Sequence, residues 1–245
     1  MVFLNTTKRL PIVFCLDISP SMGWRIGGNS SSIELLNAAV NNFISEIKND
    51  PKASAAAEIA FVTFSTDIKT QIDFTPVRKL DSVKFEPVKE GGTRMADAVI
   101  WSINEIEKKR QQLQRSEIAY YAPFLVLVTD GNPDDNDDKV RLEEAISLVK
   151  KHCDSHIGAS EIVVPFIVGV GDRVDEKTLK AFSAGFVDGY FPIKGIAEQA
   201  KSRFQEVFKL ISNSAHISVH LNKQKIIPSI KAQMRDSLDE IIGEY

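Results

Sequence analysis

The chain has 245 residues, of which 43% are hydrophobic and 26% are charged. This composition is typical of a folded globular protein, and the length suits one large α/β domain. The formal net charge of −3 argues against a protein that binds nucleic acid through its phosphate groups.

The length of the apolar runs and the number of cysteines bear on the cellular location of the protein. No apolar run is long enough to cross a bilayer, and the first ten residues lack the apolar stretch of a signal peptide. Cys15 and Cys153 are the only two cysteines, too few for a disulfide framework. We therefore expect a cytoplasmic protein with no membrane partner.

The first two elements follow directly from hydrophobic patterning. Residues 10–16 form an almost continuous apolar run, which is typical of a buried strand. Apolar residues then recur every three or four positions from Ile33 to Ile47, which predicts an amphipathic helix. Ser31 followed by Glu34 predicts a capping box where that helix begins.

The following segments predict a hairpin and then further alternation of helices and strands. Residues 59–64 and 68–74 read as two strands joined by a turn at Asp67, and a loop-like stretch follows them. Beyond that loop, the same patterns predict helices at 95–113, 138–153, 175–182 and 196–211, and strands at 123–129, 162–168 and 189–193.

This order of elements predicts the fold class. Strands that alternate with helices imply βαβ units and a mostly parallel sheet covered by helices on both faces. We predict a three-layer α/β/α, Rossmann-like fold in which the hairpin supplies one antiparallel strand. Pro165 fits poorly, because a central strand uses the backbone N–H that proline lacks.

Small oxygen-bearing side chains gather where two of the predicted strands end and where one helix begins. The first strand ends in Asp17-Ile18-Ser19-Pro20-Ser21, and the strand at 123–129 is followed by Asp130-Gly131-Asn132. Gly91-Gly92-Thr93 precedes the helix at 95–113. In a doubly wound sheet, ligands bind at the carboxyl ends of the strands, so these groups are the candidate site.

The chemistry of these groups suits a hard cation. Asp17 and Asp130 offer carboxylates, and Ser19, Ser21 and Thr93 offer hydroxyls, with no histidine or cysteine among them. Mg²⁺ prefers oxygen ligands in near-octahedral geometry and keeps several waters. We therefore expect Mg²⁺, or Mn²⁺, at this edge of the sheet. With only two acids, the ion would remain electrophilic toward an outside carboxylate.

The same residues carry a resemblance to a known family. Asp17-x-Ser19-x-Ser21, Thr93 after a Gly-Gly pair, and Asp130-Gly131 resemble the metal-ion-dependent adhesion site of von Willebrand factor A (VWA) and integrin I domains. All five motif positions hold the expected residue types. The resemblance implies that Ser19 and Ser21 bind the metal directly and that Thr93 binds it directly or through water. It places Asp17 and Asp130 near the ion, often through water.

The resemblance also implies a function and a domain division. It covers residues 8–212 and implies a module that binds a Glu or Asp carboxylate of a partner protein through the metal, without catalysis. The chain looks most similar to small bacterial VWA proteins associated with tellurite resistance and stress. Residues 213–245 form a C-terminal extension, with a strand at 216–221, a break at Pro228 and a short helix beyond. The extension either packs on the domain or binds a partner.

Two other functions compete with this interpretation. The chain could be the VWA subunit of a complex of the magnesium-chelatase or AAA-ATPase type, whose ATPase would be a separate chain. It could also be a metal-dependent phosphohydrolase with Asp17 as nucleophile, but such enzymes need a second acid two residues on, where this chain has Ser19.

Further motifs are given ordinary roles. The acidic run 134–138 does not match an EF-hand, because the required glycine and glutamate positions hold Asp135 and Arg141. Four histidines fall away from the strand ends and are interpreted as surface or packing residues: His152, His156, His216 and His220.

Overall fold

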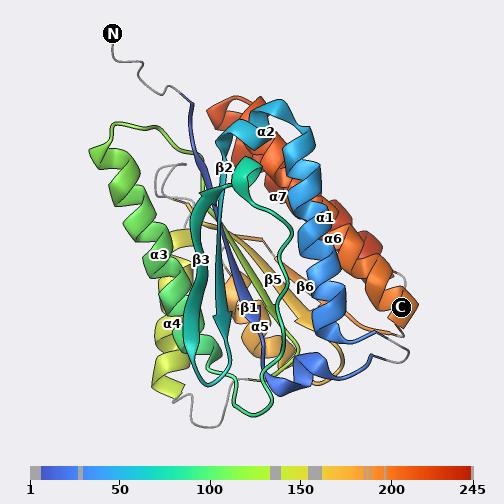
Figure 1. Ribbon diagram of the computed structural model, residues 1–245. Helices are drawn as coiled ribbons and strands as arrows, with labels where there is room; N and C mark the ends of the chain where they lie inside the picture. Colours follow the sequence, from blue (N-terminus) through green and yellow to red (C-terminus); the bar gives the residue numbers. More distant parts are fainter. Residues whose placement is uncertain are drawn as a thin grey trace.

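The computed structural model describes residues 7–26, 30–132, 139–153, 162–184, 186–187, 189–195 and 197–243. The acidic run 134–138 and His156 lie outside these residues. Strands and helices alternate along the chain (Figure 1). In order they are β1 (Leu10–Asp17), η1 (Pro20–Gly23), α1 (Ser32–Asn49), α2 (Pro51–Ala56), β2 (Ala57–Phe64), β3 (Ile68–Pro76), η2 (Val77–Lys79), α3 (Met95–Arg115), β4 (Phe124–Thr129), α4 (Lys139–Cys153), β5 (Val164–Val170), α5 (Glu176–Ser183), β6 (Tyr190–Ile193), α6 (Ala197–His220) and α7 (Lys223–Gly243).

The six strands form one sheet in the order β3-β2-β1-β4-β5-β6. Every neighbouring pair is parallel except β2 and β3, the predicted hairpin. β1, β2, β4 and β5 are buried along their whole length, as continuous apolar runs require. β3 alternates between half-buried and exposed residues, because it is an edge strand. The predicted mostly parallel α/β fold is confirmed.

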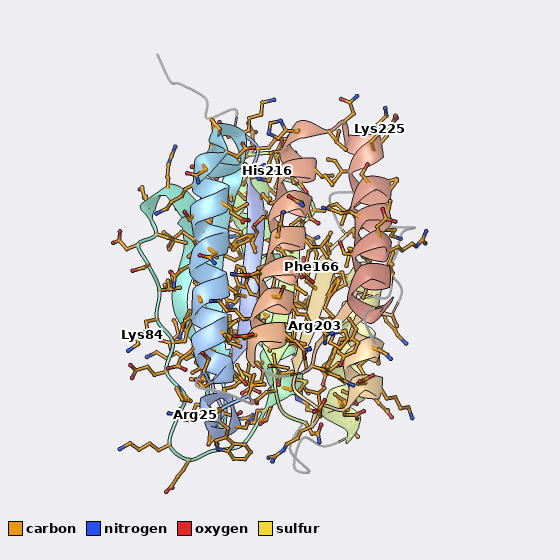
Figure 2. All side chains as sticks on the ribbon, turned by 90° about the vertical axis from the view of Figure 1, so that its right-hand side faces the viewer. Arg25, Lys84, Phe166, Arg203, His216 and Lys225 are labelled. Carbon is orange, nitrogen blue, oxygen red and sulfur yellow. The ribbon has the colours of Figure 1, made fainter. Side chains whose placement is uncertain are left out.

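Helices cover both faces of the sheet. α1, α2, α6 and α7 form one layer, in which α1 and α7 flank α6 (Figure 2). α3, α4 and α5 form the other, with α4 packed against both α3 and α5. α1 begins at the predicted capping box: the Ser31 side chain accepts from the Glu34 backbone N–H, and the Glu34 side chain accepts from the Ser31 N–H.

An aromatic cluster joins the first of these layers to the sheet. Phe14 on β1 lies with its ring centroid 5.3 Å from Phe43 of α1, 5.3 Å from Phe61 of β2 and 6.0 Å from Phe208 of α6. All four rings are buried. This packing joins α1 and α6 to the central strands of the sheet.

Pro165 lies inside β5 without costing the sheet a hydrogen bond. The Val164 N–H points toward β4, where it donates to the Pro123 carbonyl, and the Ile167 N–H points toward β6, where it donates to Gly189. Backbone N–H groups of successive residues in a strand point alternately to its two neighbours, so the N–H that Pro165 lacks would face β6. β6 pairs with β5 only from Ile167 onward, so no β6 partner is lost.

The C-terminal extension differs from the sequence prediction. Residues 216–220, predicted as the start of a strand, continue α6, which runs to His220. Pro228 does not break the chain but lies inside α7, with its ring exposed; it removes one backbone hydrogen bond of the helix. α7 packs on α6 and buries Ile230 and Met234. α6 crosses the predicted division at residue 212 without a break, and the position of that division remains a prediction.

None of the helices among the described residues is both long and apolar enough to span a membrane.

Candidate metal centre

Asp17 ends β1 with its side chain completely buried. Its Oδ1 accepts a 2.7 Å hydrogen bond from the Ser19 backbone N–H, and its Oδ2 accepts a 2.6 Å bond from the Thr129 hydroxyl. Thr129 is the last residue of β4, the strand next to β1. Asp17 is therefore a fixed carboxylate that folds its own loop back over the strand end and ties that loop to the neighbouring strand.

A row of oxygen atoms runs from the β1 loop to the β4 loop. The hydroxyls of Ser19 and Ser21 are 3.0 Å apart, and the Ser21 hydroxyl donates to Oδ1 of Asp130 at 2.7 Å. The Ser32 hydroxyl, at the start of α1, lies 3.5 Å from Oδ2 of the same carboxylate. The structure thus brings Ser19, Ser21 and Asp130 together, as the sequence predicts.

Thr93 reaches the same region from the loop before α3. The Gly92 N–H donates to the Thr66 hydroxyl at 2.8 Å, and the Arg94 N–H donates to the Ser65 carbonyl at 2.9 Å, so this loop is held against the end of β2. Gly91 has a φ of +150°, a conformation that other residues rarely adopt, which explains the first glycine of the Gly91-Gly92 pair.

Gly131 shows how closely the three loops approach. A Cβ atom at this position would lie 3.3 Å from Oγ1 of Thr93 and 3.7 Å from Oδ2 of Asp17. Thr93 and Asp17 therefore surround one small volume beside Gly131. The absence of a side chain there keeps that volume open to the oxygens.

Two carboxylates in one partly buried site repel each other. Burial raises the pKa of Asp130 to about 6, and the nearby Asp17 charge adds to the rise, while the hydrogen bond from Ser21 opposes it. A positive charge among these oxygens would offset the cost of holding two ionised carboxylates, Asp17 and Asp130, in this partly buried site. Two carboxylates, three hydroxyls and no nitrogen or sulfur donor make up a set that fits a hard divalent cation.

Sequence reasoning missed Thr129, Ser32 and the close approach at Gly131. Thr129 holds Asp17 and also accepts a 3.2 Å hydrogen bond from the Gly131 N–H, so it orders both acidic loops. Its position directly before Asp130, at a strand end, was the available signal. Ser32 lies in a run of three serines, and nothing in the sequence distinguishes it from its neighbours.

An exposed aromatic residue borders the site. Trp24 follows η1 and is 55% exposed, with its backbone N–H bonded to the Ser21 carbonyl. The guanidinium of Arg173, from the loop after β5, lies 4.9 Å from the centre of the Trp24 ring. Arg25, next in the chain, is exposed as well. This rim is apolar and positively charged beside an acidic centre.

The three histidines that the structure describes and both cysteines lie outside this site. His152 is 3.5 Å from Glu107, whereas His216 and His220 contact Asp50 at the opposite end of the sheet. Cys15 and Cys153 are free and buried, and burial raises the pKa of each thiol to about 12. Neither cysteine is suited to nucleophilic chemistry.

The chain was compared with family models, with curated proteins and with solved structures. The model of the von Willebrand factor type A domain matches residues 12–194. No curated protein matches the chain.

Three solved structures show the fold. Proximal thread matrix protein 1 from the mussel byssus, "with zinc occupied MIDAS motif", is 19% identical with a TM-score of 0.54, over 85% of this chain and 47% of that one. The PilB minor pilin from Streptococcus sanguinis is 14% identical with a TM-score of 0.57, over 86% and 63%. The von Willebrand factor type A protein from Catenulispora acidiphila is 16% identical with a TM-score of 0.54, over 85% and 43%. The matched region is therefore less than two thirds of each of these chains.

Proposed function

Because the chain belongs to the von Willebrand factor type A domain family, a family of metal-dependent adhesion and protein-interaction modules, we propose that it binds an acidic group of a partner protein through one divalent cation. Asp17, Ser19, Ser21, Thr93 and Asp130 would hold the ion. Mg²⁺ is the proposed cation, with Mn²⁺ as the close substitute. The convergence of oxygens from three distant loops is the observation that carries the proposal.

The five side chains would have different tasks. The Ser19 hydroxyl pairs with that of Ser21, which in turn donates to Asp130, and both hydroxyls would offer oxygen ligands without adding charge. Asp17, with both oxygens engaged by the protein, would set the loop geometry and add negative charge. A bound divalent cation would supply a positive centre to which a partner carboxylate oxygen can bind.

The rim supports an acidic partner. Trp24 offers exposed apolar surface, and Arg25 and Arg173 place positive charge near the site. An ion contact between metal and carboxylate becomes strong when surrounding surface excludes water. Trp24 would provide part of that surface.

The hydrolase alternative finds little support. A nucleophilic Asp17 would need an exposed oxygen, yet its side chain is completely buried and each of its oxygens accepts a hydrogen bond. The residue that would serve as its acid or base is Ser19. We therefore propose a binding module without catalysis.

The biological setting proposed from the resemblance is a bacterial stress system of the tellurite-resistance type, in the cytoplasm. Partnership with a separate ATPase subunit is the second candidate. A pull-down with the full chain, with and without chelator and with and without ATP, separates the two candidates. Capture that is sensitive to chelator and independent of nucleotide supports the first, and nucleotide-dependent capture of an ATPase supports the second.

The Trp24→Ala variant tests the rim in the same pull-down. It should weaken capture of the partner while leaving metal binding intact.

Calorimetric titration with Mg²⁺ and Mn²⁺ tests the site itself. The wild-type chain should bind one ion, and Asp17→Ala and the double variant Ser19→Ala/Ser21→Ala should lose it while keeping their circular dichroism spectra. Thr70→Ala, on the exposed edge strand, is the control and should bind as the wild type does. Unchanged affinity in the Asp17 and Ser19/Ser21 variants would refute the assignment.

A further inference from the structure

Two histidines and an aspartate meet at the end of the sheet opposite the candidate metal centre. Asp50 lies between α1 and α2, and His216 and His220 lie in the last turns of α6. Figure 2 shows His216 at one end of the molecule and Arg25, in the loop after η1, near the other. α1 and α6 both run away from the strand ends that carry Asp17 and Asp130, so the two sites are separate.

Local structure orients the side chains of Asp50, His216 and His220 toward one another. Asp50 caps α2: its Oδ1 accepts from the backbone N–H groups of Lys52 at 2.7 Å and Ala53 at 2.8 Å, which leaves Oδ2 directed away from that helix. His216 and His220 are four residues apart on α6 and therefore occupy one face of the helix.

The three groups contact one another through a single oxygen. Oδ2 of Asp50 lies 2.6 Å from Nδ1 of His216 and 2.8 Å from Nε2 of His220. One ligand atom from each residue lies within 4.8 Å of the others. The Asp50 side chain is 14% exposed, whereas those of His216 and His220 are 34% and 43% exposed, so an ion could enter from solvent.

We propose that Asp50, His216 and His220 form a second metal site, specific for a transition-metal ion of the zinc class. Two imidazoles at i and i+4 on a helix, completed by a carboxylate, are a ligand set that Zn²⁺ uses, with water in the fourth position. Imidazole nitrogen favours Zn²⁺, Ni²⁺, Co²⁺ and Cu²⁺, whereas the oxygen set around Asp17 favours Mg²⁺ and Mn²⁺. The two ends of the molecule would therefore select different ions.

The two separations from Asp50 need only a small adjustment to hold an ion. Ligand atoms around a tetrahedral zinc ion stand about 3.3 Å apart, given bonds of about 2.0–2.1 Å. The present separations of 2.6 and 2.8 Å would open by about 0.5–0.7 Å, while the two imidazole nitrogens lie within 4.8 Å of each other. The exposed imidazoles can make this movement, while the two backbone N–H groups on Oδ1 keep Asp50 in place.

A bound ion would connect elements that are distant in the sequence. It would join the C-terminal end of α6 to the junction of α1 and α2. Because the unfolded chain does not hold these groups together, Zn²⁺ should stabilise the folded protein by an amount that rises with the logarithm of its concentration relative to its Kd.

The test uses variants that keep the hydrogen bonds and remove the metal ligands. The side-chain amide of His216→Asn takes the place of Nδ1, and that of His220→Gln takes the place of Nε2, so each can still donate to Asp50. Asp50→Asn retains the oxygen that caps α2 but loses the negative charge. The full-length chain, stripped with chelator, is titrated with Zn²⁺ by calorimetry and with Co²⁺ by visible absorption.

The expected result separates the two sites. Wild type should show a Co²⁺ absorption band typical of nitrogen ligation and a rise in melting temperature with Zn²⁺. Both should persist in Ser19→Ala/Ser21→Ala, and both should be lost when His216→Asn or His220→Gln is added to that double variant, in which the candidate metal centre no longer holds an ion. Equal Zn²⁺ and Co²⁺ binding by the serine double variant with and without His220→Gln would overturn the proposal, and so would loss of the signal in the serine double variant alone.

Discussion

The Ser21 hydroxyl donates a 2.7 Å hydrogen bond to Oδ1 of Asp130, although 109 positions separate the two residues in the sequence. Ser21 belongs to the loop after β1, and Asp130 directly follows β4. β1 and β4 are parallel neighbours, so their carboxyl ends meet at one edge of the sheet. The topology, more than any local motif, builds the candidate metal centre.

Thr129→Val tests a residue that supports the centre without serving as one of the proposed ligands. The change removes the hydroxyl that donates to Oδ2 of Asp17 and keeps the shape of the side chain. We expect Mg²⁺ affinity to fall about 10- to 100-fold, as for other partners that orient metal ligands. Calorimetry gives the affinity. Thr63→Val, whose hydroxyl pairs with Gln71 instead, is the matched control, and equal affinities in the two variants would contradict the role given to Thr129.

Gly131→Val tests the close approach of the three loops. The new side chain would crowd Oγ1 of Thr93 and Oδ2 of Asp17, because even its Cβ would lie 3.3 and 3.7 Å from them. We expect Mg²⁺ binding to be strongly weakened, with the circular dichroism spectrum retained. Asn132→Ala, at the exposed next position, should bind Mg²⁺ normally. Normal binding by Gly131→Val would show that this space is not needed.

The raised pKa of Asp130 predicts a pH dependence of stability for the chelator-treated protein. Its pKa is about 6 in the folded state against an ordinary value of 3.8, so between these values the folded state holds more protons than the unfolded state. The free energy of unfolding should therefore fall as pH rises through about 6. Asp130→Asn should remove this component. Urea unfolding at several pH values measures this component. If the free energy of unfolding of wild type and of Asp130→Asn depended on pH in the same way, the raised pKa of Asp130 would be contradicted.

Ile230→Ala tests whether the C-terminal extension contributes to the fold. Ile230 is fully buried on α7, so the substitution should lower the free energy of unfolding by about 2–5 kcal/mol. Arg235→Ala, at an exposed position of the same helix, should change it by no more than about 0.5 kcal/mol. Both are measured by urea unfolding. Two equally small effects would mean that α7 adds little to the stability of the domain.

Sequence patterns predict the sheet well because its central strands are largely apolar runs and β3 alternates in polarity as an edge strand does. Residues 216–221 were wrongly predicted as a strand. Six residues with alternating polarity cannot distinguish a strand from a helix end, and the packing of α6 against α1 and α7 decides between them. Pro228 does not end the helix for a related reason: apolar residues on both sides of it, Ile227 and Ile230, are buried and hold α7 in place despite the lost hydrogen bond.

The candidate centre was predictable in its residues but not in its contacts. Asp17 and Asp130 stood out because each follows a buried strand, and parallel strands end together. The pairing of Thr129 with Asp17 depends on the register between β1 and β4, which no local pattern reveals. Local patterns also cannot show that His216 and His220 contact Asp50, since these histidines lie 166 and 170 residues from it in the sequence.

The exposed edge of β3 has a consequence for how the protein behaves at high concentration. An unpaired strand edge invites another chain to extend the sheet, and proteins oppose this with charged side chains. Lys69 and Asp73 are exposed on β3, and Pro76 ends it. A second copy docking along this edge would have to strip water from these charged side chains, and Pro76 has no N–H to offer it. We expect this placement to protect the protein from self-assembly into fibres.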